Sequence, residues 1–380
     1  MAGGLLLLGG RLSDLIGRRR MFLCGVTVFA AASALSGLAA DPAMLVGSRF
    51  AQGAAEAMAA PAAFGLVALL FPDGNERAKA IGIFGGVAGL GGTLGPVISG
   101  LILQGLSWRW IFFINIPVAA VAVIAVRRLV DESKAQTRVT AGRTDVLGAL
   151  LVTTGLVAAV YGLIQAASRA WGSPEVVLPL VIGGLVLALF VVREQRTRNP
   201  LVPLHFFSNR TRVGANLLTL CFASVFFTMF FLLTLYLQQV EDYSALRTGI
   251  AYLPFGIAIS VAIGVSSKLV TRVGIRALLG VGFGLCAAGV LLLAGIRVEG
   301  SYLTQVLPGM LLMAFGSGLC FAGFSNASVH GVTTEDASLA SGVQNAVQQV
   351  GGAIGLAVLA TLAFRHAAAG VRHGVTTAAA

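Results

Sequence analysis

The 380 residues are 57% hydrophobic and only 11% charged, and the mean hydropathy is +0.90. A soluble domain carries about 25% charged residues, so a water-soluble core cannot absorb this much apolar surface. The same composition excludes disordered and fibrous chains. The chain is therefore predicted to be an all-α polytopic membrane protein, with the lipid bilayer as its solvent.

The net charge of +11 comes from Lys and Arg residues in short clusters between apolar runs. Such clusters are typical of cytoplasmic loops, and none is large enough for a nucleic-acid footprint, so no nucleic-acid partner is expected. Four cysteines lie inside apolar runs without metal-like spacing, which favours small buried side chains over metal ligands: Cys24, Cys221, Cys286 and Cys320. We expect no metal.

Apolar runs long enough to cross a bilayer occur eleven times, and residues 1–8 look like the tail of another. The runs are continuous and rich in Ala, Leu and Gly, which predicts helices rather than strands. They cover about 21–40, 43–71, 79–104, 109–126, 146–166, 175–192, 213–238, 246–267, 276–295, 302–325 and 338–364. Of the 26 basic residues, 19 fall on the side of the loop 9–20, which predicts that this side is cytoplasmic.

The first motif is GGRLSDLIGRRR, residues 9–20. Its glycines, Gly10 and Gly17, allow tight turns and close approach of two helix ends. Asp14 can pair with nearby arginines, among them Arg18 and Arg19, or can face a helix N-terminus. The motif therefore predicts a cytoplasmic clasp that closes and opens, and the bland alternative is an ordinary basic loop.

The second motif is LVGSRFAQGAAEAMAAPAA, residues 45–63. An arginine within a span costs several kcal/mol unless it faces protein or water, so Arg49 is a candidate functional residue. Glu56, the one carboxylate deep in a span, lies seven residues further on, on the same helix face about 10 Å away. We expect burial to raise its pKa, which suits a proton carrier or an anchor for a cation; a locally neutralised packing residue is the alternative.

The third motif is GIFGGVAGLGGTLGPVISG, residues 82–100. Glycines four residues apart form a smooth face for close helix packing, and a proline bends the helix. No strand precedes the glycines and no Gly-Lys-Ser/Thr follows, so a phosphate loop and ATP-driven transport are disfavoured, and no cofactor is expected. The residues concerned are Gly82, Gly91, Gly95, Pro96 and Gly100.

The chain repeats itself. A shift of 260 residues places Gly82, Gly91, Gly92 and Gly95 on Gly342, Gly351, Gly352 and Gly355, and a shift of 257 pairs Gly17 with Gly274. Mapped through the repeat, the first copy lacks about 44 residues at its start and the second lacks its last span. We therefore expect a truncated version of a fourteen-span parent, in which two six-span halves flank two extra spans.

With these motifs and with WRWIFFINIPV at 108–118, the chain resembles the major facilitator superfamily, in particular the fourteen-span drug:proton antiporters of the EmrB/QacA type. The loop 9–20 is similar to the superfamily's loop signature. A second pattern of the family is matched by Arg49, Gln52 and Gly53. The resemblance implies that the arginine of this pattern takes part in proton transfer. The third motif is similar to the antiporter signature, with Ser99 in place of one glycine.

The resemblance implies a major facilitator fold of two pseudo-symmetric helical bundles, at 1–128 and 213–380, with a central linker and two extra spans at 129–212. It also implies proton-coupled efflux of amphipathic small molecules, including cationic ones, across the cell membrane by a monomer that is not an enzyme. A nutrient importer and a non-transporting fragment are the alternatives. Polar residues in spans either line the substrate cavity or bridge helices: Gln52, Asn216, Gln344, Asn345 and Gln348.

Overall fold

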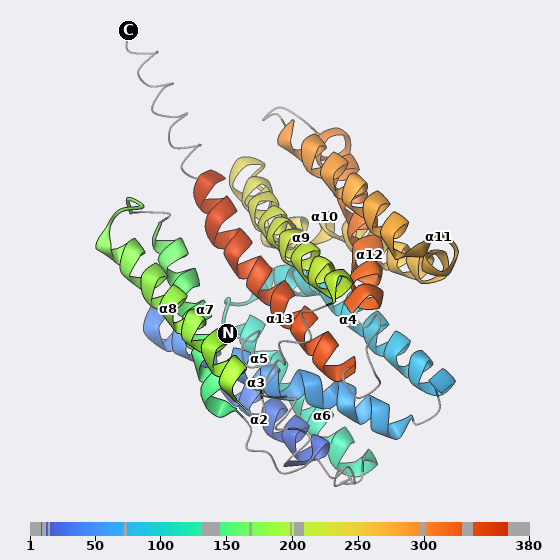
Figure 1. Cartoon of the computed structure of the whole chain (residues 1–380). Coiled ribbons are helices and arrows are strands. Elements are labelled where there is room, and N and C mark those ends of the chain that lie inside the picture. The colour runs from blue at the N-terminus through green and yellow to red at the C-terminus, as the bar shows by residue number, and fades with distance from the viewer. Residues whose placement is uncertain are drawn as a thin grey trace.

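A computed structural model describes residues 9, 13, 16–71, 74–130, 145–166, 169–197, 200, 209–296, 301–328 and 337–363. Within these residues every regular element is a helix, which confirms the all-α prediction (Figure 1). The α-helices are α2 (Arg18–Gly37), α3 (Pro42–Leu70), α4 (Gly74–Gly105), α5 (Trp110–Phe113), α6 (Asn115–Leu129), α7 (Val146–Gln165), α8 (Pro174–Arg196), α9 (Arg210–Leu235), α10 (Ala245–Ala251), α11 (Leu253–Ala294), α12 (Leu307–Ser328) and α13 (Ala337–Gly355). Three π-helical turns are η2 (Tyr236–Val240), η3 (Tyr302–Val306) and η4 (Leu356–Ala360).

Each of the eleven predicted runs coincides with helix. Nine stretches of the described chain are long and apolar enough to cross a membrane. The other two runs lie in α3 and α4, whose 29 and 32 residues exceed the roughly 20 that a span needs. The protein is therefore a multi-pass membrane protein. Residues 1–8, where a further span was expected, lie outside the described residues.

Polar residues just before the apolar runs set where several helices begin. Asp41 accepts a 2.8 Å hydrogen bond from the Met44 N–H, with Pro42 at the first helical position of α3. Asn209 caps α9 in the same way, and Ser244 caps α10. These side chains satisfy backbone N–H groups that have no partner within their helix.

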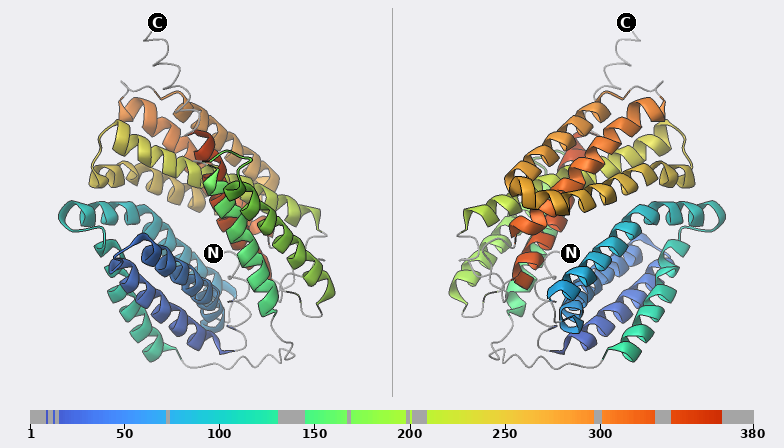
Figure 2. Two further views of the ribbon diagram at one scale, coloured as in Figure 1. Left: turned by 90° about the vertical axis from the view of Figure 1, so that its left-hand side faces the viewer. Right: turned by 90° about the vertical axis from the view of Figure 1, so that its right-hand side faces the viewer.

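The helices form two groups that meet at an angle, with a hairpin beside them (Figure 2). In the first group, α2 packs against α3, α5 and α6; in the second, α11 packs along α12, and α9 along α13. The hairpin of α7 and α8 lies next to α13 and contacts it through α7 (Figure 1). The predicted boundary at 128 falls one residue before the end of α6, whereas that at 212 falls two residues inside α9.

The two copies of the repeat share an unusual backbone conformation at equivalent glycines. Gly17, at the start of α2, has φ +105°, and Gly274, at a break inside α11, has φ +80°. Only glycine adopts such values without strain, so the pairing of these residues in the sequence reflects a common backbone turn. The turn at Gly274 divides α11 between the two predicted spans 246–267 and 276–295.

We predict that Gly17→Ala and Gly274→Ala each lower the stability of the protein by about 2 kcal/mol, because an added Cβ is incompatible with the positive φ. The measurement is the melting temperature in detergent. Gly280→Ala is the control, since Gly280 is helical and has open space around its Cα. Equal melting temperatures for all three variants would contradict the assignment of strain.

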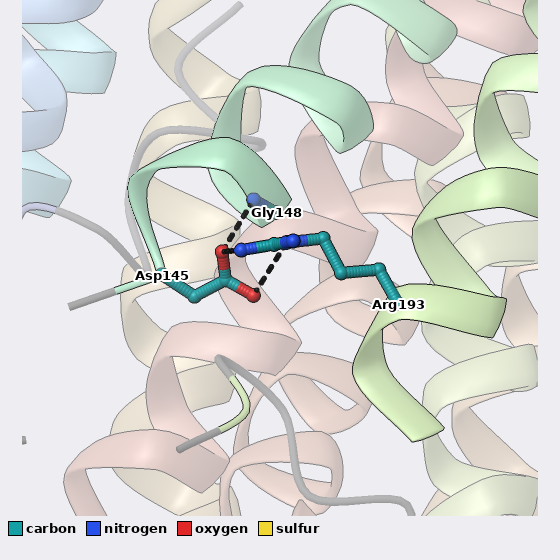
Figure 3. A network of polar contacts seen from close by, with 3 residues as sticks. All are labelled: Asp145, Gly148 and Arg193. Atoms are coloured by element: carbon teal, nitrogen blue, oxygen red, sulfur yellow. Dashed lines mark hydrogen bonds and ion pairs between the residues drawn. The ribbon is translucent and has the colours of Figure 1, made fainter. Parts of the chain in front are cut away.

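The α7–α8 hairpin is held together at one end by an ion pair between a buried carboxylate and a partly exposed guanidinium (Figure 3). Asp145, whose side chain is fully buried, caps α7 by accepting a 2.8 Å hydrogen bond from the Gly148 N–H. The Arg193 guanidinium on α8 approaches the same carboxylate, with Nη2 and Nε each 2.8 Å from Oδ1. Burial raises the pKa of Asp145, but the Arg193 and Gly148 hydrogen bonds and the Arg193 charge outweigh burial and lower it.

We predict that Arg193→Ala lowers the stability of the protein by about 3 kcal/mol, because it leaves a buried carboxylate without its partner. The lowered pKa means that the ion pair contributes fully above the ordinary carboxyl value of 3.8 and is lost as the pH falls below it. Melting temperatures measured between pH 7 and pH 2 should therefore differ between wild type and variant down to about pH 4 and converge only well below it.

The matched control lies at the other end of the same hairpin. Arg169 and Glu175 form a 3.3 Å ion pair whose side chains are 55% and 46% exposed. Glu175→Gln should change the stability by less than about 0.5 kcal/mol, since exposed pairs contribute little. A loss as large as that of Arg193→Ala would show that the buried pair has no special role.

Candidate functional site

The functional residues predicted on α3 lie in contact. Arg49 Nη1 donates a 2.8 Å hydrogen bond to Gln52 Oε1. Gln52 is only 3% exposed, whereas Arg49 is exposed. Because a guanidinium can only donate, the Gln52 amide oxygen must face Arg49, and the Gln52 amide nitrogen must face the other way.

That amide nitrogen donates a hydrogen bond to Ser33 Oγ on α2. Ser33 Oγ also accepts a 3.1 Å hydrogen bond from Asn115 Nδ2, at the first residue of α6. One turn along α2, Ser36 Oγ lies 3.5 Å from Gln52 Oε1 and 2.8 Å from Ser48 Oγ. We call this set the α3 polar network; its members are Ser33, Ser36, Ser48, Arg49, Gln52 and Asn115.

Close packing of α2 and α3 allows such short side chains to meet. A Cβ added at Gly25 on α2 would lie 2.8 Å from the Ala59 backbone N on α3 and 3.0 Å from the Ala55 carbonyl oxygen. Ser33 and Ser36 both lie on the apolar helix α2, and both are fully buried. Buried hydroxyl and amide groups require partners, so the network fixes the register of α2, α3 and α6.

The exposed end of the network is braced by the segment that follows α4. The Arg49 guanidinium lies 5.8 Å from the centre of the Phe112 ring on α5, a cation–π contact. Arg109, just before α5, donates a 3.1 Å hydrogen bond to the Ala39 carbonyl after the end of α2. The WRWIFFINIPV motif and the Arg49 motif, distant in sequence, therefore converge on one site.

Glu56 is exposed on α3, so the expectation that it is buried is wrong. Its neighbours Ala55 and Ala57 are fully buried, because the packed faces of α3 lie beside Glu56 rather than over it. Glu56 shares a helix stripe with Gln52 and Arg49, at spacings of four and seven residues. It lies fourteen residues from each end of α3, about 21 Å along the axis, at the middle of the span.

The basic residues of the first motif bind backbone carbonyl groups. Arg18 Nη1 donates a 2.9 Å hydrogen bond to the Gly65 carbonyl on α3, and Arg19 Nη2 donates one of 2.9 Å to the Arg127 carbonyl in the last turn of α6. The start of α2 is therefore tied to both of its neighbours. Gly10 and Asp14 lie outside the described residues, so the expected Asp14 pairing is a prediction.

The glycine-rich motif lies on α4, which contains Gly82 and continues through Pro96. Near Pro96 this helix crosses α10 of the second group at very short range. A Cβ added at Gly100 would lie 2.6 Å from the Ala245 carbonyl oxygen, and one added at Gly249 would lie 2.5 Å from the Pro96 carbonyl oxygen. The two halves of the molecule therefore meet backbone to backbone here.

The remaining glycines of the motif differ between the copies. Within the described part of the chain, Gly91 and Gly95 have nothing within 4 Å of an added Cβ. Their counterparts on α13, Gly351 and Gly355, pack against Leu220 and Ser224 of α9, and Ser224 Oγ donates a 2.8 Å hydrogen bond to the Gly351 carbonyl. At Leu356, the position that corresponds to Pro96 inside α4, the second copy begins the π-helical turn η4.

The polar residues of the second half lie on these same helices. Asn216 is 7% exposed on α9 and its Nδ2 donates to the Arg212 carbonyl, while its Oδ1 is buried with no hydrogen-bond partner among the described residues. Gln344 and Gln348 on α13 are half-buried, and Asn345 is exposed.

Four network members were not predicted as site residues: Ser33, Ser36, Ser48 and Asn115. Gly249 was missed as well. Serines in an apolar run usually bond their own helix, as Thr27 does to the Leu23 carbonyl, so the sequence carries no sign of partners on another helix. For Asn115, its place in the WRWIFFINIPV motif was a usable signal.

The cysteines and acids of the described residues form no group suited to a metal ion. Cys286 and Cys320 are buried, as expected, but Cys24 and Cys221 are exposed. The expectation was wrong for these two because an apolar run in a membrane protein also presents an outward face. All four are free thiols.

The comparisons with known proteins agree with this architecture. Residues 1–356 match the sequence profile of the Major Facilitator Superfamily. The chain is 40% identical over 372 residues to the "Lincomycin resistance protein" of Streptomyces lincolnensis, with 96% of this chain and 74% of the relative covered. It is 39% identical over 381 residues to the "Puromycin resistance protein pur8" of Streptomyces alboniger, covering 99% and 75%.

A third relative is the "Cephamycin export protein CmcT" of Amycolatopsis lactamdurans, 36% identical over 363 residues, with 94% of this chain and 74% of the relative covered. The profile match spans nearly all of the described helices, and every regular element among the described residues is a helix. The chain is a membrane transporter rather than an enzyme, and it belongs to the Major Facilitator Superfamily.

Proposed function

We propose that the chain exports amphipathic small molecules, including cationic ones, in exchange for protons by alternating access. In this proposal it is a monomeric member of the fourteen-span drug:proton antiporters of the EmrB/QacA type. It lies in the cell membrane with its basic loops on the cytoplasmic side. Relatives named for resistance to lincomycin and puromycin and for cephamycin export support the outward direction.

The observation that carries the proposal is the placement of charge on α3. Arg49 is held by a buried amide while its charged group stays exposed, and Glu56 lies on the same stripe at the middle of the span. A carboxylate at that depth is costly to keep charged unless it meets water, a cation or a guanidinium. Glu56 would carry the proton, and Arg49 would favour release of the proton.

The gate in this proposal is the cytoplasmic end of α2. Arg18 and Arg19 hold the carbonyl groups of α3 and α6, and Gly17 supplies the turn that precedes them. The α4–α10 crossing at Gly100 and Gly249 would serve as the contact about which the two halves rock. Substrate would reach the cavity beside Gln52, with Asn216, Gln344, Asn345 and Gln348 contributing from the second half.

The test is the direction of flux in proteoliposomes that contain the purified chain. Ethidium, tetraphenylphosphonium and puromycin are the probes, and valinomycin with equal potassium clamps the membrane potential. An acidic lumen should drive probe uptake, because protons leave as the probe enters. Uptake that requires an acidic exterior instead would identify a symporter and overturn the proposal, as would uptake that ignores the pH gradient.

A further inference from the structure

The α3 polar network reaches beyond the residues that the transport motifs single out. Its inner end consists of Ser33 on α2 and Asn115 on α6, and neither side chain touches Arg49 or Glu56 in the described residues. Both act on Gln52: Asn115 bonds Ser33, and Ser33 bonds the Gln52 amide nitrogen. These hydrogen bonds connect α6, α2 and α3 and end at the exposed Arg49 guanidinium.

The direction of each hydrogen bond in this chain follows from the chemistry. Arg49 can only donate, which orients the Gln52 amide and leaves its nitrogen pointing at Ser33. In the structure Ser33 Oγ accepts from both the Gln52 and the Asn115 amide nitrogens. Removing the Ser33 oxygen would free the buried Gln52 amide to rotate, and its oxygen would no longer be aimed at Arg49.

We propose that Ser33 and Asn115 are positioning residues, which set the orientation of Gln52 and through it the place of the Arg49 guanidinium on the helix stripe that carries Glu56. This inference rests on the proposed function. A guanidinium that is held in place favours the charged form of a carboxylate on its helix face. A guanidinium that is free to move favours that charged form less. The two residues would therefore control the pH at which the transporter exchanges its proton.

The titratable and charged groups near this stripe come from few elements. α3 supplies Arg49 and Glu56, and α5 presents the neutral Phe112 ring. Along α2, the residues from Met21 to Gly37 include no acid and no base other than the thiol of Cys24. Arg109 is bound to the Ala39 carbonyl beyond the end of α2. Arg49 is thus the charged group whose position the network can change.

The experiment compares Ser33→Ala and Asn115→Leu with wild type in proteoliposomes, with ethidium as the probe. Both variants should reduce proton-driven uptake by about tenfold at neutral pH and displace its pH profile towards higher pH, the lower end of the effect of losing a partner that orients a metal ligand. Asn115→Leu keeps the approximate size of the side chain, loses the donor and adds no charge. Ser33→Thr keeps the acceptor oxygen and should restore the wild-type profile.

Thr27→Ala is the matched control, because Thr27 lies on the same helix and bonds the Leu23 carbonyl of its own turn. It should leave both rate and profile unchanged. The double variant Ser33→Ala with Asn115→Leu should lose no more than either single variant, because both act through Gln52. Additive losses, or a reduced rate without a displaced profile, would overturn the positioning role and leave only a packing role.

A different result would contradict the proposed function rather than the present inference. If Arg49→Ala leaves the pH profile of uptake at its wild-type position, Arg49 has no part in proton exchange and the proposed function itself is contradicted. If Arg49→Ala displaces the profile while Ser33→Ala and Asn115→Leu do not, only the present inference is overturned. Equal expression and monodisperse elution of each variant establish that the protein is folded in every arm.

Discussion

Glu56→Gln should lower proton-driven uptake of ethidium by about 100-fold, the scale of a lost proton-transfer group. The amide has the size of the carboxylic acid but cannot release a proton, so the coupled cycle stops. Counterflow, in which labelled probe exchanges for unlabelled probe without net proton movement, should continue in this variant. The measurement is the initial rate of each process in the same vesicles.

Glu76→Gln is the control, since Glu76 is an exposed acid in the first turn of α4. It should support both processes at the wild-type rate. Arg49→Ala should also impair proton-driven uptake, because it removes the positive charge on the same stripe of α3 as the carrier. If Glu56→Gln takes up ethidium at the wild-type rate, Glu56 is not the proton carrier. If the variant loses counterflow together with uptake, the defect lies in substrate binding or folding.

Gly249→Ala should destabilise the protein by about 2 kcal/mol and reduce transport, because the new methyl group has no room. It would lie 2.5 Å from the Pro96 carbonyl oxygen and 2.9 Å from the Val97 Cα, and backbone atoms cannot rotate away. Gly100→Ala meets the Leu246 Cα at 2.6 Å from the other side of the same crossing. Both variants would force apart α4 and α10, where the two halves of the molecule meet.

The matched control is Gly264→Ala on α11, where an added Cβ has open space. Replacing a helical glycine by alanine should there raise the stability by about 0.5 kcal/mol and leave transport intact. Melting temperature in detergent and ethidium uptake are measured for all three variants. If Gly249→Ala and Gly264→Ala behave alike, the crossing tolerates separation and cannot be the contact about which the halves rock.

The sequence predicted the helices well because membrane spans depend on local composition. Each apolar run became helix, and Asp41, Asn209 and Ser244 mark helix starts by side-chain chemistry that local sequence records. The repeat could also be predicted from the sequence. Gly17 and Gly274 were paired from sequence alone, and both have positive φ. These features depend on a few neighbouring residues.

The site could be predicted only in part, because its geometry depends on how helices pack. Arg49 and Gln52 are three residues apart on one helix, so their contact follows from helix periodicity. The bond between Gln52 and Ser33 requires the register of α3 against α2, which the contact of Gly25 with Ala59 determines. The exposure of Glu56 depends on which faces of α3 are covered, and the Asp145–Arg193 pair joins residues 48 apart in sequence.

The most direct test of the account measures protons and substrate together. Liposomes containing the chain hold a pH-sensitive dye at symmetrical pH, and ethidium is added outside without any imposed proton gradient. The account predicts that ethidium entry acidifies the exterior and raises the pH of the lumen in the wild type, and that Glu56→Gln abolishes this proton movement while counterflow continues. Ethidium entry that moves no protons in the wild type, or equal proton movement in Glu56→Gln, would contradict it.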